Sequence, residues 1–307
     1  MRVFVTGAAG FLGSAIAQHL VASGHEVIAA IRPSRLKSGL SIPGCQMTAW
    51  DALNPPGAIP SCEAVVHCAT SNDILSRDFG AGIDLSVKGT HSLLQQAKAA
   101  GVTQFVFLST IQVHGTELHG TITEDSPIVS ETSYALNHCL GEETCRMFAH
   151  SWPEAEITLL RPSNVYGVPS LPTVNRSTLV PMCFVKQAME EGRITLRSSG
   201  RQTRNFVSTT EVAQTCQRLL VQTPIPGVRP VLAVSDWHYS IVDVAHLTAS
   251  IHEEVFDRPL PVEVLSNSPE TGNLFEAHSK VLPASTSASA SSSQMCAVIR
   301  SLFHSLS

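Results

Sequence analysis

Three glycines near the N-terminus have the type and the spacing to hold a phosphate group. Gly7, Gly10 and Gly13 follow the pattern G-x-x-G-x-x-G, between a short apolar run at residues 2–5 and an apolar helical stripe over residues 15–21. A Cβ at these positions would hold the backbone away from a pyrophosphate, or would clash where helix and strand meet. The helix N-terminus then presents free N–H groups to negative charge. The pattern predicts a dinucleotide-binding turn; the alternative is a tight turn in which the glycines serve packing alone.

The end of the next strand predicts which dinucleotide is bound. Residues 27–31 form an apolar run that continues into Arg32 and Arg35 without a carboxylate. An acidic side chain there would hydrogen-bond the adenosine ribose of NAD, whereas guanidinium groups favour the 2′-phosphate of NADP. We therefore expect NADP(H) to be preferred over NAD(H); the alternative is that the two arginines are ordinary solvated loop charges.

Two later strand ends are expected to adjoin the same cofactor. Asp51 ends a strand predicted at residues 47–51, where it would either contact the adenine edge or simply begin a turn. Ala69 is one of the small residues that end a strand predicted at residues 64–70, and small residues there would let the backbone approach the cofactor. His67, in that strand, is expected to be a core histidine and not a ligand.

Strands and helical segments alternate through the first half of the chain. Further strands are predicted at residues 104–110 and 157–162, and helices at residues 84–100 and 133–143. This alternation predicts an α/β fold with a Rossmann-type, doubly wound parallel sheet that is covered by helices on both faces.

The second half of the chain has shorter, mixed elements. We expect residues 1–167 to form a dinucleotide-binding Rossmann domain and residues 168–307 to form mainly a small C-terminal substrate-binding cap, with about 205–245 returning to the Rossmann domain. The Ser/Ala-rich stretch at residues 284–293 predicts a flexible loop. Residues 296–306 predict a last short amphipathic helix.

Composition excludes several classes of function. The chain has 307 residues, 43% of them hydrophobic, and a net charge of -5 with no long basic run, so we expect no nucleic-acid partner. No apolar run is long enough to span a bilayer, and a cytoplasmic protein without a membrane partner is expected. The eight cysteines form no C-x-x-C pair, which indicates buried free thiols in a reducing compartment and does not favour a zinc or other metal site.

Four blocks of sequence resemble one family, the extended short-chain dehydrogenase/reductases of the NAD(P)-dependent epimerase/dehydratase group. The first block, Thr6–Gly13, is close to TGxxGFxG, and the second, Phe107–Gly115, is similar to the strand that ends in the catalytic hydroxyl. The third, Tyr134–Glu142, is similar to YxxxKxxxE, and the fourth, Leu160–Gly167, looks like LRPxNVYG. A weaker match, Gln202–Val207, resembles the RDFV stretch. These blocks are spread over residues 1 to about 245.

The resemblance implies a role for individual residues. Tyr134 would be the acid/base that shuttles a proton, Thr110 would be its hydroxyl partner, and Ser109 is adjacent. A lysine four residues after the tyrosine would hold the nicotinamide ribose and lower the tyrosine pKa. The resemblance also implies a homodimer through the helices that include Tyr134. It further implies that four residues contact the cofactor: Phe11, Leu12, Pro162 and Val165. Asn164 and Arg204 would bind the pyrophosphate of a sugar nucleotide.

The lysine position departs from the family and holds His138. One helical turn places Tyr134 and His138 on the same face, and both would then serve the same cleft and contact the cofactor. Histidine is shorter than lysine and mostly neutral at pH 7 when unperturbed, so it would help Tyr134 less to ionise. His138 would hydrogen-bond the ribose, relay a proton or act as a base; otherwise the site has decayed, or the fold has been turned to non-redox work.

These observations lead to one main functional expectation and several alternatives. The main expectation is an enzyme, an NADP(H)-dependent oxidoreductase that acts on a small carbonyl or alcohol substrate. The alternatives are a nucleotide-sugar epimerase or dehydratase, a non-redox isomerase or dehydratase, and a catalytically dead cofactor-binding protein. Ser86, Thr209 and Thr210 also depart from the family pattern, and the tail from Ser279 onward keeps little of the usual cap sequence, which weakens a carry-over of the sugar-nucleotide substrate.

Overall fold

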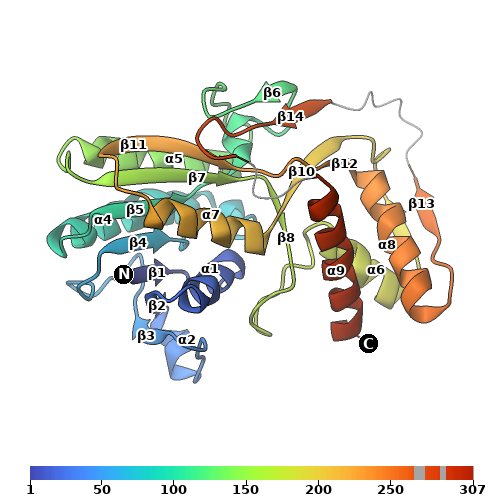
Figure 1. Ribbon diagram of the computed structural model, residues 1–307, viewed down its shortest axis with the longest axis horizontal. Helices are drawn as coiled ribbons and strands as arrows, with labels where there is room; N and C mark the ends of the chain where they lie inside the picture. Colours follow the sequence, from blue (N-terminus) through green and yellow to red (C-terminus); the bar gives the residue numbers. More distant parts are fainter. Residues whose placement is uncertain (266–273, 284–287, 307) are drawn as a thin grey trace.

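A parallel sheet lies at the centre of the computed structural model, which describes residues 1–265, 274–283 and 288–306 (Figure 1). Among these residues it has seven strands in the order β11-β7-β5-β4-β1-β2-β3, and every neighbouring pair is parallel. The predicted Rossmann-type α/β fold is therefore confirmed. The strands are β1 (Arg2–Thr6), β2 (Glu26–Ile31), β3 (Gln46–Ala49), β4 (Ala64–His67), β5 (Gln104–Leu108), β7 (Glu156–Pro162) and β11 (Gly227–Ala233).

Helices cover both faces of this sheet, as the sequence predicts. The α-helices of the described residues are α1 (Phe11–Ala22), α2 (Pro33–Lys37), α3 (Phe79–Ile83), α4 (Thr90–Ala99), α5 (Ser133–Ala149), α6 (Met182–Glu191), α7 (Thr209–Val221), α8 (Ile241–Phe256) and α9 (Ala288–Leu306). Of these, α6, α8 and α9 do not cover the sheet but pack together beside it. On one face α1 and α7 pack together and share a core cluster with side chains of β1 and β2. On the other face α4 and α5 share a second cluster with the opposite side chains of the same strands. Burial on both faces explains why the inner strands are almost continuously apolar.

The helix predicted at residues 84–100 begins earlier than expected. It starts with α3 at Phe79, because Asp78 caps that turn by accepting a hydrogen bond from Ala81 N at 3.0 Å. It then passes through a wider, π-helical segment over Asp84–Gly89 before α4.

His67 is a core residue, as predicted. It is fully buried in β4, with Nδ1 2.7 Å from Thr6 Oγ1 and Nε2 3.2 Å from Thr90 Oγ1. Burial lowers the pKa of His67 to about 3, so the ring is neutral inside the sheet.

The strand order reverses between β1 and β4, which lie side by side although two strands separate them in sequence. In doubly wound folds, ligands bind outside the carboxyl ends of the strands at such a switch point. The turn after β1 and the small residues after β4 therefore lie where a dinucleotide would be bound.

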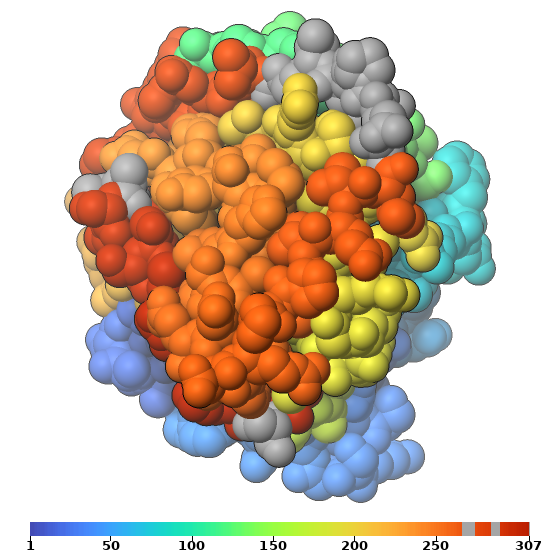
Figure 2. All heavy atoms as spheres, turned by 90° about the vertical axis from the view of Figure 1, so that its right-hand side faces the viewer, coloured from blue at the N-terminus to red at the C-terminus, as the bar shows by residue number. Residues whose placement is uncertain are grey.

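Short elements from the second half of the chain form a separate layer beside the sheet (Figure 1). A core cluster joins α6, α8 and α9 there, and Figure 2, which faces this end of the molecule, shows α8 spread in orange next to α6 in yellow. The sheets β12-β10-β8 and β14-β6 pair strands from before and after residue 167, whereas both strands of the β13-β9 sheet belong to this layer. Their strands are β6 (Gly120–Ile122), β8 (Asn164–Tyr166), β9 (Ile194–Leu196), β10 (Thr203–Ser208), β12 (His238–Ser240), β13 (Val262–Val264) and β14 (Phe275–Ala277).

The segment predicted to return to the Rossmann domain divides between the two layers. β10 pairs with β8 and β12, α7 packs on α1, and β11 joins the edge of the large sheet. The domain boundaries themselves stay a prediction.

The Ser/Ala-rich stretch is helical where the structure describes it, so the predicted flexible loop is wrong for residues 288–293. These residues open α9, which continues to Leu306 and includes the predicted helix at residues 296–306. Alanine is the best helix former, and the short Ser291 side chain is fully buried at the point where Tyr166 Oη donates to Ser291 O at 3.4 Å. Residues 284–287 of the stretch lie outside the described residues.

Two whole-chain expectations can be compared with the described residues. No helix there is both long enough and apolar enough to cross a bilayer. The eight cysteines are free thiols, and three of them, Cys62, Cys145 and Cys216, are buried, whereas the others are partly exposed.

Candidate active site

The glycine turn after β1 is packed so closely that side chains cannot enter it. Gly7 has φ +63°, and a Cβ there would lie 2.7 Å from Ala69 N. A Cβ on Gly13 would lie 2.2 Å from Gly7 O, and Gly10 N already donates to Gly7 O at 2.8 Å. The turn therefore brings bare backbone to the switch point, which is what the approach of a pyrophosphate requires.

The N-terminus of α1 also fits a pyrophosphate group. Gly10 is the N-cap residue, and no side chain caps the helix. The free N–H groups of the first turn thus remain available to an anion. Ala69 follows β4 and borders this glycine turn, and Ala69 N donates a hydrogen bond to Thr6 Oγ1 at 3.2 Å. The residues present fit a dinucleotide.

The three residues expected to contact the adenosine end of the cofactor differ in whether they have bonding partners. Arg32 and Arg35 are exposed around the start of α2 and make no ion pair with another described residue. Asp51 begins a turn, the second of its two expected roles, because its Oδ1 accepts a hydrogen bond from Leu53 N at 2.9 Å.

Tyr134 and Thr110 come together at the carboxyl edge of the sheet. Tyr134 lies in the first turn of α5, which Thr132 caps by accepting a hydrogen bond from Ala135 N at 3.1 Å. Thr110 follows β5, and its side chain lies close enough to the Tyr134 phenol to lower the pKa of that phenol. Because Thr110 Oγ1 already accepts from Gln112 N at 3.2 Å, its own proton is free to point to the Tyr134 oxygen.

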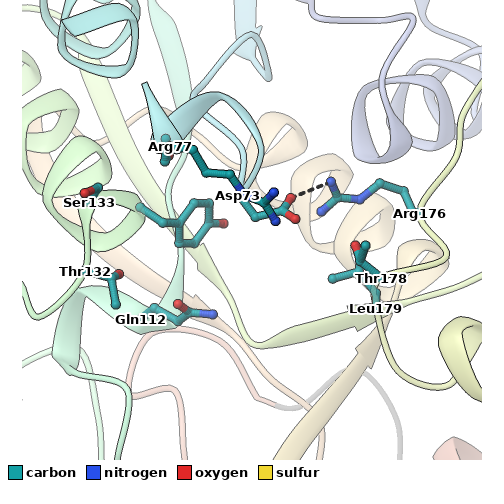
Figure 3. Close-up of a pocket in the computed structure, with 10 residues that line it drawn as sticks. Asp73, Arg77, Gln112, Thr132, Ser133, Arg176, Thr178 and Leu179 are labelled. Carbon is teal, nitrogen blue, oxygen red and sulfur yellow. Dashed lines mark hydrogen bonds and ion pairs between the residues drawn. The ribbon is translucent and has the colours of Figure 1, made fainter. Parts of the chain in front are cut away.

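A cavity of about 430 Å³ opens in front of Tyr134 (Figure 3). Figure 3 shows Asp73 between Arg77 and Arg176, with Thr132 and Gln112 to the left of the view. Asp73 Oδ1 and Arg176 Nη1 form an ion pair of 2.8 Å. The lining residues are Asp73, Ser76, Arg77, Gln112, Thr132, Ser133, Tyr134, Arg176, Thr178 and Leu179.

His138 packs against Tyr134 but does not line this cavity. The two rings meet edge to face with centroids 4.6 Å apart, and only 3% of His138 is exposed. Its Nε2 lies 3.0 Å from Ser71 O. Burial lowers the pKa of His138 to about 4, so the ring is neutral at pH 7. The predicted shared helix face is confirmed, but the structure brings no cation to position 138.

Ser109 is directed away from Tyr134. Its hydroxyl donates to Glu142 Oε1 at 2.6 Å, and Glu142 also accepts two hydrogen bonds from Arg161, at 2.8 Å and 2.6 Å. Both partners of this ion pair are 1% exposed. Burial alone would raise the pKa of Glu142, but Arg161, Ser109 and Arg146 together lower it, so the carboxylate is charged. Ser109, which is adjacent to Thr110 in sequence, therefore joins a buried network with Glu142 and Arg161.

The residues predicted to grip a substrate lie on two paired strands. Asn164 on β8 donates from Nδ2 to Asn205 O on β10 at 2.9 Å. Arg204 on β10 donates to Thr203 O at 3.1 Å, and burial lowers its pKa while Glu117 raises it. Neither lines the cavity in front of Tyr134.

Four further predicted cofactor contacts lie around the carboxyl edge of the sheet. Phe11 and Leu12 open α1, Pro162 ends β7 and Val165 lies in β8. Phe11 packs against the core cluster of α6, α8 and α9, whereas Leu12 and Val165 pack on the cluster of α1 and α7.

Four residues of the cavity wall were not among the predicted site residues: Asp73, Arg77, Gln112 and Arg176. They stand in loops and in short 3₁₀ turns; Gln112 lies within the Phe107–Gly115 block, but no hydrophobic period or known motif marks the other three. Asp73 and Arg176 are 103 residues apart in sequence, so no local signal could pair them.

Comparison with known proteins places these features in a family. The family model of the NAD dependent epimerase/dehydratase family matches residues 3–228. A dTDP-glucose 4,6-dehydratase of Streptomyces griseus is 28% identical over 220 residues, which are 67% of this chain and 65% of that relative. A dTDP-4-dehydro-6-deoxy-D-allose reductase of Streptomyces bikiniensis is 26% identical over 267 residues, which are 81% of this chain and 80% of that relative.

Solved structures agree on the fold. The UDP-glucuronic acid 4-epimerase from Bacillus cereus, in complex with UDP-glucuronic acid and NAD, superposes with a TM-score of 0.75. It is 22% identical in sequence, and the match covers 100% of this chain and 99% of that structure. The matched family model shows that the chain belongs to the NAD dependent epimerase/dehydratase family, and the glycine turn and the seven-stranded sheet agree with it.

Proposed function

We propose that this chain is a nicotinamide-dinucleotide-dependent enzyme that acts on a nucleotide sugar, with Tyr134 as its acid/base. The observation that carries the proposal is that Tyr134, next to Thr110, lines a cavity at the same sheet edge as the glycine turn. The substrate class is supported by relatives named for dTDP-sugars and UDP-sugars. These names favour the nucleotide-sugar alternative over the small carbonyl or alcohol substrate that was the main expectation from the sequence.

Each residue of the site has a definite task in this proposal. Bare backbone at Gly7, Gly10 and Gly13 holds the diphosphate against the N-terminus of α1. Tyr134 gives or takes the proton of a substrate hydroxyl, and Thr110 donates a hydrogen bond to the phenolate oxygen that results. A bound nicotinamide ring would supply hydride transfer.

The same proposal includes a preference for NADP(H). The end of β2 has no carboxylate to hydrogen-bond the 2′-hydroxyl of NAD, and Arg32 and Arg35 are exposed there without an ion-pair partner among the described residues. A 2′-phosphate would find two guanidinium groups.

The test begins with binding and ends with turnover. Calorimetry with NADPH, NADP⁺, NADH and NAD⁺ measures whether the chain binds a dinucleotide. Turnover of UDP-glucose, UDP-glucuronic acid and dTDP-glucose is then compared between wild type and Tyr134→Phe. We expect Tyr134→Phe to bind the dinucleotide normally and to lose turnover by at least about a hundredfold.

Tyr166→Phe is the matched control, because it removes one phenolic oxygen that contacts Ser291 O and not the cavity. The control should keep its turnover. Unchanged turnover in Tyr134→Phe would refute the assigned role of Tyr134, and absence of dinucleotide binding would refute the proposal as a whole.

One observation favours a second candidate, a cofactor-binding protein without turnover. The position of the family's lysine holds a buried, neutral histidine that is already bonded to Ser71 O. Tight dinucleotide binding without turnover of any of the three nucleotide sugars would support this candidate.

A further inference from the structure

The positive charge that the resemblance places beside Tyr134 does not come from its own helix. His138 is neutral and almost fully buried, and Ser71 O occupies its Nε2. The charges on the cavity side of Tyr134 come instead from the walls: Asp73, Arg77 and Arg176.

Arg176 is held in place from two directions. Its backbone carbonyl accepts a hydrogen bond from Leu179 N at 3.0 Å, which closes a turn before α6. Its guanidinium donates to Asp73 Oδ1 at 2.8 Å, as the dashed line in Figure 3 shows. The side chain is 20% exposed, and its Nε has no hydrogen-bond partner among the described residues. The guanidinium charge is thus held at the cavity wall, while its Nε–H group has no hydrogen-bond acceptor among the described residues.

The loop that carries Asp73 is fixed by the same helix that carries Tyr134. His138 binds Ser71 O, and Asn137 Nδ2 donates to Ser71 Oγ at 3.3 Å and to Ser76 Oγ at 3.2 Å. The histidine that replaces lysine therefore anchors the loop whose carboxylate orients Arg176.

We propose that Arg176, oriented by Asp73, supplies at Tyr134 the positive charge that a lysine at position 138 would otherwise provide. This inference rests on the acid/base role proposed above for Tyr134. Arg176 is a positioning residue in this sense: it acts on the phenol through space and favours the phenolate form.

The electrostatic balance at the phenol agrees with this assignment. Burial raises the pKa of Tyr134, whereas the nearby Thr110 side chain and then Arg176 lower it. Asp73 raises the pKa of Tyr134, but by less than Arg176 lowers it. Arg176 is the only cation among these groups, although Arg77 lines the same cavity.

A direct measurement is feasible because the chain has only three tyrosines. With ¹³Cζ-labelled tyrosine, NMR follows the ionisation of each phenol in the protein without cofactor, and Tyr134→Phe assigns the resonance of Tyr134. We expect Arg176→Gln to raise the pKa of Tyr134 by roughly half a unit to one unit. Arg176→Lys should restore most of the shift, because the charge is kept.

Arg77→Gln is the matched control, since it removes the same kind of charge from the same cavity wall and should leave the pKa of Tyr134 unchanged. Arg176→Met provides a second neutral variant if the glutamine variant does not fold. An unchanged pKa in Arg176→Gln or Arg176→Met, or an equal rise in Arg77→Gln, would overturn the inference.

The outcome is separable from that of the proposed function. A shifted pKa in Arg176→Gln together with an active Tyr134→Phe would keep the electrostatic coupling and refute the acid/base role. An inactive Tyr134→Phe with an unshifted pKa in Arg176→Gln would keep the acid/base role and refute the coupling. In an active enzyme, the limb of the pH–rate profile that belongs to Tyr134 should move with its measured pKa.

Discussion

Nε2 of His138 and the backbone carbonyl oxygen of Ser71 are 3.0 Å apart, and both are buried. A carbonyl oxygen can only accept, so Nε2 carries the ring proton and Nδ1 is left with a lone pair. Nδ1 receives no hydrogen bond from the described part of the chain. The histidine thus joins α5 to the loop after β4, 67 residues away in sequence, and its role in this structure is to fix that loop.

Stability should fall in mild acid because of this histidine. The pKa of His138 is lowered by burial from 6.5 to about 4, so between these values only the unfolded chain binds the proton. The free energy of unfolding therefore decreases as pH falls through this window, by up to about 1.4 kcal/mol per pH unit for one histidine. Urea unfolding at about pH 7 and about pH 5 measures the loss.

His138→Gln should reduce this loss, because the amide can still donate to Ser71 O but does not titrate. The exposed His150, changed to Gln, serves as the control and should leave the pH dependence of wild type intact. An equal pH dependence in wild type and His138→Gln would contradict the buried, neutral state of this ring.

The ion pair of Glu142 and Arg161 should be costly to break from one side. Both side chains are 1% exposed, so Glu142→Gln leaves a buried guanidinium without its counter-charge. We expect the free energy of unfolding to fall by about 3–5 kcal/mol. The neighbouring Glu143 is 69% exposed and binds Arg146, so Glu143→Gln should cost about 1 kcal/mol or less. Similar losses for the two variants in urea unfolding would argue against the buried network.

Gly13→Ala should distort the glycine turn that is proposed to hold the dinucleotide. The new Cβ would lie 2.2 Å from Gly7 O, and the backbone must shift by more than a rotamer change can absorb. We expect a loss of dinucleotide affinity of at least about tenfold and a destabilisation of about 1–3 kcal/mol. Gly57→Ala is the control, because a Cβ there meets nothing within 4 Å. Calorimetric titration of both variants decides; normal affinity in Gly13→Ala would show that the turn does not hold the diphosphate.

Arg32→Ala and Arg35→Ala should weaken NADPH binding selectively. A charge-assisted hydrogen bond to a 2′-phosphate contributes about 1.5–3 kcal/mol, so removing one should cost about tenfold or more in affinity for NADPH while NADH binding stays the same. Lys37→Ala removes an exposed charge from the same short helix and should change neither affinity. If both arginine variants lost NADPH and NADH affinity equally, the arginines would not read the 2′-phosphate.

The architecture could be predicted from the sequence because its signals are local. The buried strands are continuous apolar runs, and the glycine spacing accompanies a strand, a helix and a second strand, so the order of elements predicts the parallel sheet. His67 could be assigned to the core because it stands inside such a run. The Ser/Ala-rich stretch misled the prediction, because its composition is typical of loops, while the burial of Ser291 against Tyr166 depends on packing between residues 125 apart.

By itself, then, the sequence determined the fold class, the dinucleotide turn and the shared helix face of Tyr134 and His138, since each depends on neighbours within a turn or two of the chain. Only the tertiary structure decided three hydrogen-bond partners. Ser109 binds Glu142 and not Tyr134, and Nε2 of His138 binds the carbonyl oxygen of Ser71. Asp73 forms an ion pair with Arg176, which is 103 residues away in sequence. Side-chain partners of this kind depend on how loops from different strands pack at one edge of the sheet. No local pattern records those distances, so the charge and hydrogen bonding of the site emerge only when the sheet is assembled.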